Sequence, residues 1–92
     1  MDLRQGEHLI RIHRFRFVKP SGCGMGSIEL MVEESLTSAT GGDPRCTARP
    51  DHQELVPRPE FTAHGDTVEE ALDNCLAAIR TRRFYELFLP KA

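Results

Sequence analysis

The sequence lacks any long apolar run. No segment approaches the roughly 20 consecutive apolar residues of a membrane-spanning helix, and residues 1–11 contain no apolar stretch of the kind found in secretory signals. Both absences argue against the membrane and secretory classes. We therefore expect a soluble, cytoplasmic protein.

Cysteine is scarce and widely spaced. The three residues, Cys23, Cys46 and Cys75, are odd in number and far apart. This arrangement excludes a complete disulfide framework and favours reduced thiols. We expect Cys75 to be a small apolar residue of the core.

Motifs for metals, cofactors and catalysis are also missing. The histidines and cysteines include no close pair such as Cys-x-x-Cys, which a structural zinc site would need. Residues 22–26 are rich in glycine, but neither a Gly-Lys-Ser ending nor a helix follows them, so they predict a hairpin turn and not a phosphate loop. Cys23 has no recognisable activating base. The sequence therefore predicts no metal, no cofactor, no catalytic residue and no enzymatic activity.

The length of the chain limits its core. A chain of 92 residues with 39% apolar and 28% charged residues is typical of one small globular domain. Such a domain leaves apolar surface uncovered, and association can bury it. We predict a homodimer.

Charge is unevenly distributed along the chain, although the net charge is only −2. Residues 1–20 and 80–92 each carry +3, whereas residues 21–64 and 65–79 each carry −4. If the two basic ends meet, they would form a positive face; otherwise they are separate solvated charges. The candidate binding residues are Arg11, Arg14, Arg16, Arg80, Arg82 and Arg83.

The clearest local element is an amphipathic helix over residues 67–79. Its apolar residues recur at helical spacing, and Thr67 and Glu70 have the spacing of a capping box. Arg80, Arg82 and Arg83 follow at the negative end of the helix dipole, where cations are stabilised without any ligand.

Two strands precede this helix. Residues 9–19 are rich in β-branched and aromatic residues, but Ile10 and Ile12 fall on one face and Phe15 and Phe17 on the other. Either both faces are partly covered or a bulge near His13 changes the phase. Residues 27–34 alternate between apolar and mainly acidic side chains, as a half-buried strand does.

The N-terminal strand also alternates basic and aromatic residues. Exposed aromatic rings beside cations are suited to stacking nucleic-acid bases. The simpler interpretation places Phe15 and Phe17 in the core, with Arg14 and Arg16 as their solvated neighbours.

The remaining segments are less regular. Residues 35–59 contain glycine and four prolines and predict a mobile loop. Residues 60–64 predict a short extended piece before the helix. Residues 84–89 are compatible with either a strand or a helical segment, which Pro90 ends.

Residues 61–79 carry a family resemblance. A short strand, Gly65-Asp66-Thr67, a Glu-Glu-Ala run and a helix ending in Ala78-Ile79 are similar to the strand-turn-helix signature of HicB-like antitoxins. The resemblance implies a β-β-β-α-β order, frequent dimerisation and a partner that is a small ribonuclease toxin.

These observations predict one α+β domain, in which a small antiparallel sheet of three to four strands packs against one amphipathic helix. We expect a non-enzymatic binding or regulatory protein that holds a protein partner through its sheet edge or its loop. The alternative is a nucleic-acid-binding module that uses a basic face.

Overall fold

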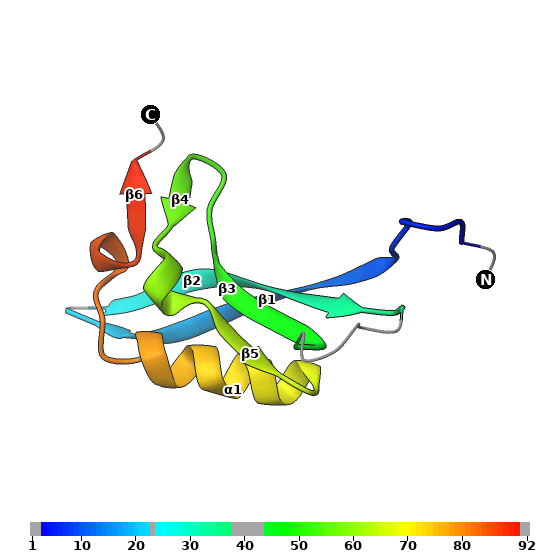
Figure 1. Ribbon diagram of the computed structural model, residues 1–92. Helices are drawn as coiled ribbons and strands as arrows, with labels where there is room; N and C mark the ends of the chain where they lie inside the picture. Colours follow the sequence, from blue (N-terminus) through cyan, green and yellow to red (C-terminus); the bar gives the residue numbers. More distant parts are fainter. Residues whose placement is uncertain (1–2, 23, 38–43, 91–92) are drawn as a thin grey trace.

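The computed structural model describes residues 3–22, 24–37 and 44–90. Within them, a four-stranded antiparallel sheet has the order β1-β2-β3-β5, and one helix packs against it (Figure 1). A small second sheet, β4-β6, rises away from the helix at one end. The predicted α+β class is confirmed. The elements are β1 (Ile10–Ser21), β2 (Gly24–Ser35), β3 (Cys46–Asp51), β4 (Leu55–Pro57), η1 (Pro59–Phe61), β5 (Ala63–Gly65), α1 (Val68–Ile79), η2 (Phe84–Glu86) and β6 (Phe88–Pro90).

The hairpin of β1 and β2 has an unbroken register. It runs from the pair Ile10 and Ser35 to the pair Ser21 and Gly24 without a change of phase. The proposed bulge near His13 is therefore wrong, and both faces of β1 are used. Phe15 and Phe17 are half-buried and pack against the core, whereas Ile12 lies on the opposite face with 46% of its surface exposed.

The central strand β3 lies inside the segment that was predicted to be a mobile loop. The prediction of a structureless segment is wrong for Cys46–Asp51 and Leu55–Pro57, while residues 38–43 lie outside the described residues. Cys46, Ala48 and Pro50 alternate as buried residues. Small buried side chains on β3 let α1 approach this part of the sheet closely.

Helix α1 begins as the capping pattern predicts. The Thr67 hydroxyl oxygen accepts a hydrogen bond from the Glu70 backbone N–H at 3.0 Å, which satisfies one of the unpaired donors of the first turn. Glu70 reaches back to the N–H of Asp66 at 3.4 Å. Ala71, Cys75 and Ile79 then form the buried stripe, so the predicted core role of Cys75 is confirmed.

The core lies between α1 and the sheet and continues toward the second sheet. Its buried apolar residues come from β2, β3, η1, α1 and the C-terminal segment and are Ile28, Leu30, Val32, Cys46, Ala48, Phe61, Ala71, Cys75, Ile79, Leu87 and Phe88. Phe15, Phe17, Leu72 and Leu76 are only partly covered and border this core. One flank of the core, next to β1, is therefore incompletely closed.

The C-terminal segment contains both of the predicted alternatives. Phe84–Glu86 form a 3-10 turn, and Phe88–Pro90 pair with β4 as strand β6. The rings of Phe84 and Phe88 lie 5.1 Å apart, and the ring of His52 lies within 5.7 Å of both. This aromatic cluster connects the second sheet to the end of β3. In the described part of the chain, no helix combines the length and apolar character needed to cross a membrane.

Candidate functional site

The outer edge of β1 is the main unpaired feature of the sheet. Only two residues connect Ser21 with Gly24, so these two residues form a hydrogen-bonded pair. Along an antiparallel ladder, hydrogen-bonded pairs alternate with pairs whose backbone groups point outward. At the other end, the Leu36 N–H donates to the Leu9 carbonyl at 3.0 Å. Odd-numbered residues of β1 thus bond to β2. The backbone groups of Ile10, Ile12, Arg14, Arg16 and Val18 point away from it.

Pro20 fits this pattern. It occupies an even-numbered position of β1, where the missing N–H would face outward and not toward β2. Proline within a sheet is usually confined to such edge positions. The outward row of donors therefore begins at Ile10 and stops at Val18. Among residues 3–22, 24–37 and 44–90, no backbone group pairs with this row.

The face of the sheet opposite α1 is charged. Arg14 lies 2.6 Å from the Asp51 carboxylate and Arg16 lies 2.7 Å from Glu29. Arg49 contacts Glu33 in a third ion pair. We call these six side chains the charged face. Because each cation has a carboxylate partner, this face has no net charge.

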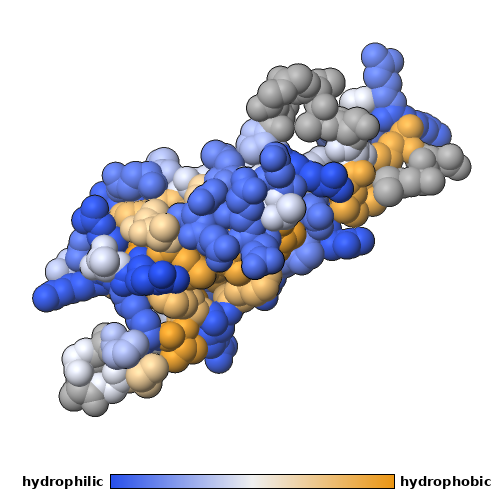
Figure 2. All heavy atoms as spheres, turned by 90° about the horizontal axis from the view of Figure 1, so that it is seen from below, coloured by the Kyte–Doolittle hydropathy of each residue, from blue (hydrophilic) through white to orange (hydrophobic). Residues whose placement is uncertain are grey.

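An apolar hollow lies on the helix side of β1. It measures about 150 Å³ and is lined mainly by apolar side chains of β1, β2 and α1, namely Phe15, Phe17, Leu30, Leu72 and Leu76 together with Arg16. We call it the β1 groove. Figure 2, seen from the side of α1, shows hydrophobic surface bordering the hydrophilic outer side of the helix. The β1 groove runs beside the outward backbone row.

The predicted basic residues do not form one face. Arg14 and Arg16 belong to the charged face, and Arg11 lies near the far end of β1. The Lys19 ammonium, however, donates to the carbonyls of Arg80 at 3.1 Å and Arg82 at 2.6 Å. Within the described residues, the two basic ends of the chain therefore meet where Lys19 contacts the chain just after the end of α1. We call Lys19, Arg80, Arg82 and Arg83 the basic corner.

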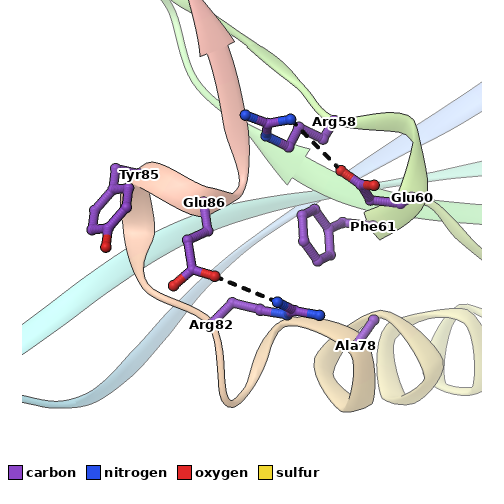
Figure 3. Close-up of a pocket in the computed structure, with 7 residues that line it drawn as sticks. All are labelled: Arg58, Glu60, Phe61, Ala78, Arg82, Tyr85 and Glu86. Atoms are coloured by element: carbon purple, nitrogen blue, oxygen red, sulfur yellow. Dashed lines mark hydrogen bonds and ion pairs between the residues drawn. The ribbon is translucent and has the colours of Figure 1, made fainter.

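A larger cleft lies beneath the second sheet. It has a volume of about 600 Å³ and is lined by residues from η1, α1 and the C-terminal segment, namely Arg58, Glu60, Phe61, Ala78, Arg82, Tyr85 and Glu86 (Figure 3). Arg82 lies 3.4 Å from Glu86, with its guanidinium 5.8 Å from the centre of the Phe61 ring. Arg58 faces Glu60 at 4.0 Å. Two ion pairs cancel within the cleft, so it does not select ligands of one charge.

Three ionisable groups in the described residues have a shifted pKa. Burial raises the pKa of Cys46, and it raises the pKa of Cys75 to about 11, so neither thiol is activated as a nucleophile. A hydrogen bond from His13 lowers the pKa of Glu34. In the described ranges, no three histidine, cysteine or acidic side chains gather in a way that could hold a metal ion.

The sequence predicts a sheet edge as a candidate surface but does not identify β1 as the edge strand. The available signals were the density of cations on this strand and a proline near its end. Both features are common on edge strands because they discourage unwanted pairing. The β1 groove had no sequence signal, since Leu72 and Leu76 were indistinguishable from core residues of the helix.

No protein-family model matches the chain, and no curated protein or solved structure matches it either.

Proposed function

We propose that this chain is a non-enzymatic binding protein that holds an extended segment of a protein partner along the outer edge of β1. One observation carries the proposal: a row of outward backbone groups from Ile10 to Val18 lies directly beside the β1 groove. In strand addition, main-chain hydrogen bonds provide affinity and pockets for alternate side chains provide specificity. The edge and the groove supply both requirements side by side.

The resemblance of residues 61–79 to HicB-like antitoxins points in the same direction. Members of that family act by holding a small protein, and they need no catalytic residue to do so. We therefore propose an antitoxin-like or regulatory role for this chain, with a small ribonuclease as one class of partner. The partly closed core next to β1 supports a protein ligand, because a bound segment would cover Phe15 and Phe17.

A matched pair of variants tests the edge. Ile12→Pro removes one outward N–H without touching a bond to β2, whereas Ile12→Thr keeps that N–H and still changes the side chain. Proteins retained from native cells by wild type and by Ile12→Thr, but lost with Ile12→Pro, would support the proposal. Equal retention by all three forms would contradict it, provided that the proline variant remains folded.

Nucleic-acid binding is a second candidate, favoured by the basic corner. Lys19 contacts the carbonyls of Arg80 and Arg82, which brings cations of both chain ends together. Binding through such a cluster should weaken steeply as salt rises, because it depends on the release of counterions from phosphates. Arg80→Ser combined with Arg83→Ser should abolish it. No change in the polarisation of a labelled RNA or DNA at low salt would exclude this candidate.

The predicted homodimer is tested with the same preparation. Light scattering behind a sizing column should give a mass twice that of the chain if two copies associate. A monomer that enlarges only when a protein partner is added would favour an edge kept free for that partner.

A further inference from the structure

The charge along β1 narrows the class of partner. The strand has the sequence Ile-Arg-Ile-His-Arg-Phe-Arg-Phe-Val-Lys-Pro-Ser, with four cations and no acidic residue. Neighbouring strands lie about 4.8 Å apart, so a strand added at the outer edge would have Arg14 and Arg16 as its nearest charged neighbours on the charged face. The backbone of Glu29 would be roughly twice as far away and that of Asp51 farther still, although their carboxylates lie 2.7 Å from Arg16 and 2.6 Å from Arg14.

The two faces of an added strand would meet different surroundings. Side chains on the helix side would lie over the β1 groove, where Phe15 and Phe17 are half-buried and Leu72 and Leu76 flank them. Side chains on the other face would meet Arg14 and Arg16, whose side chains are 67% and 68% exposed, flanked by the exposed apolar residues Ile12 and Val18. A well-matched strand therefore alternates apolar with acidic residues.

Resting on the function proposed above, we infer that the partner segment is an acidic strand whose apolar residues fill the β1 groove and whose carboxylates face Arg14 and Arg16. The chain already contains such a strand on the inner side of β1. In β2, Ile28, Leu30 and Val32 face the core, while Glu29 pairs with Arg16 on the charged face. The partner would repeat on the outer side the pattern that β2 presents on the inner side.

A second copy of the chain is a poorer occupant of the same edge. Antiparallel pairing of β1 with its copy in a register centred on Arg14 and Arg16 would place these arginines opposite, or diagonal to, the same arginines. Like charges directly opposite one another destabilise a strand pair. Arg11 and Lys19 add further positive charge on the other face of both strands. In this register, charge favours an acidic strand over a second copy of β1 at the same edge.

Three peptides test this inference on the full-length protein. The first copies residues 27–35, Ser-Ile-Glu-Leu-Met-Val-Glu-Glu-Ser, with blocked ends. The second carries Glu29→Gln, Glu33→Gln and Glu34→Gln, and the third carries lysine at the same positions. All three keep the same apolar residues. The glutamate and glutamine peptides are nearly equal in size and differ mainly in charge, whereas the lysine peptide reverses the charge on a longer side chain.

Hydrogen exchange of isotope-labelled protein locates any binding. Without peptide, the outward amides of Ile12, Arg14 and Arg16 should exchange quickly, while the inward amides of Phe15 and Phe17 are protected by β2. The glutamate peptide should protect the outward amides. It should bind about tenfold more tightly than the lysine peptide at low salt, and this preference should shrink as salt screens the charges. Ile12→Pro should weaken binding, with the inward amides still protected as proof of folding.

Each outcome has one meaning. If the glutamine or lysine peptide protects the outward amides as well as the glutamate peptide does, the acidic partner is overturned and the edge function stands. If none of the three protects them at up to about 1 mM peptide, both proposals are overturned. If the outward amides become protected without peptide as the mass doubles, a second copy occupies the edge and the inferred partner is wrong.

Discussion

The two edges of the four-stranded sheet differ in length and in cover. At one edge, β1 spans twelve residues, and its outward backbone row lies beside a partly open groove. At the other edge, β5 spans three residues and leads directly into α1. An ideal Cβ on Gly65 would lie only 2.6 Å from the Ala71 backbone nitrogen, so helix and strand are in close contact there.

If the proposed function is correct, this difference separates the edge that stabilises the fold from the edge that binds a partner. Proteins commonly protect sheet edges by making them short or covering them, because free edges pair with other chains. Here β5 is protected in both ways, whereas β1 is long and carries charge. Substitutions near β5 should therefore disturb folding, and substitutions on the outer side of β1 should disturb binding while leaving the fold intact.

The largest expected effect on stability comes from a substitution at Gly65, where α1 covers β5. Gly65→Ala would place a methyl group 2.6 Å from the Ala71 nitrogen and 2.9 Å from the Glu70 Cβ. Relieving such overlap should cost about 2–3 kcal/mol, measured by urea unfolding. Gly24→Ala is the control, since no heavy atom lies within 4 Å of its new methyl group. Equal stability of the two variants would show that α1 is not tightly seated on β5.

Raising the pH should lower the free energy of unfolding through Cys75, which lies on the buried face of α1. Burial raises the pKa of Cys75 from 9.0 to about 11, so the native state holds this proton more tightly than the unfolded chain. The resulting stabilisation is complete below the unfolded pKa and is lost as pH rises toward 11. The loss should approach about 2 kcal/mol. In Cys75→Ala the free energy of unfolding should fall less over the same interval, and identical slopes would contradict the assignment.

A smaller effect is expected at the start of the covering helix. Thr67→Ala removes the acceptor of the Glu70 N–H and should destabilise the protein by about 1 kcal/mol. Thr67→Ser retains the hydroxyl and should remain close to wild type. Thermal unfolding of the three proteins distinguishes these outcomes. An alanine variant as stable as wild type would mean that the cap adds nothing to the closure of this edge.

The smallest effect is expected on the free edge. Arg14→Gln and Arg16→Gln each break an ion pair with a highly exposed guanidinium, so each should change stability by less than about 0.5 kcal/mol. Arg49→Gln on central β3 is the comparison, because its side chain is only 28% exposed. Unfolding in urea compares the three. A loss above 1 kcal/mol for Arg14→Gln would assign β1 a structural role instead.

Strong local signals made most of the fold predictable. The apolar stripe and cap of α1 and the alternation in β2 each use many residues with one consistent periodicity. The fold class followed from these elements. The continuous register of β1 could not be predicted, because its large apolar residues occupy both faces and a change of phase would have explained that pattern equally well. Which face is buried depends on the position of α1.

Strand β3 was missed for a different reason. Its inward residues, Cys46, Ala48 and Pro50, are small or cyclic and give little β-strand signal. Proline argues against a central strand because it cannot donate to the ladder. Here the backbone nitrogen of Pro50 points away from β2, toward the side of β3 on which β5 lies. The pairing with β5 already ends at Ala48, so in the described part of the chain no strand is present beside Pro50 to accept a hydrogen bond. No ladder bond is lost, and this tolerance depends on the length of a neighbouring strand that sequence alone does not specify.

The candidate site was predictable only in its residue types. Arginine and aromatic residues on the N-terminal strand were compatible with a stacking surface or with core residues beside solvated cations, and their division between two faces comes from the hairpin register. Leu72 and Leu76 line the β1 groove because α1 does not fully cover the helix-facing side chains of β1. Such a gap is a property of packing and has no pattern in the sequence.

The short β5 also determines how far any assembly can grow. Open-ended stacking of identical chains would require the β1 edge of one molecule to dock on the β5 edge of the next. Three residues pressed against α1 give such a docking strand little backbone to pair with. A strand added at β1 would thus complete the sheet, and open-ended stacking of chains through these two edges would be disfavoured.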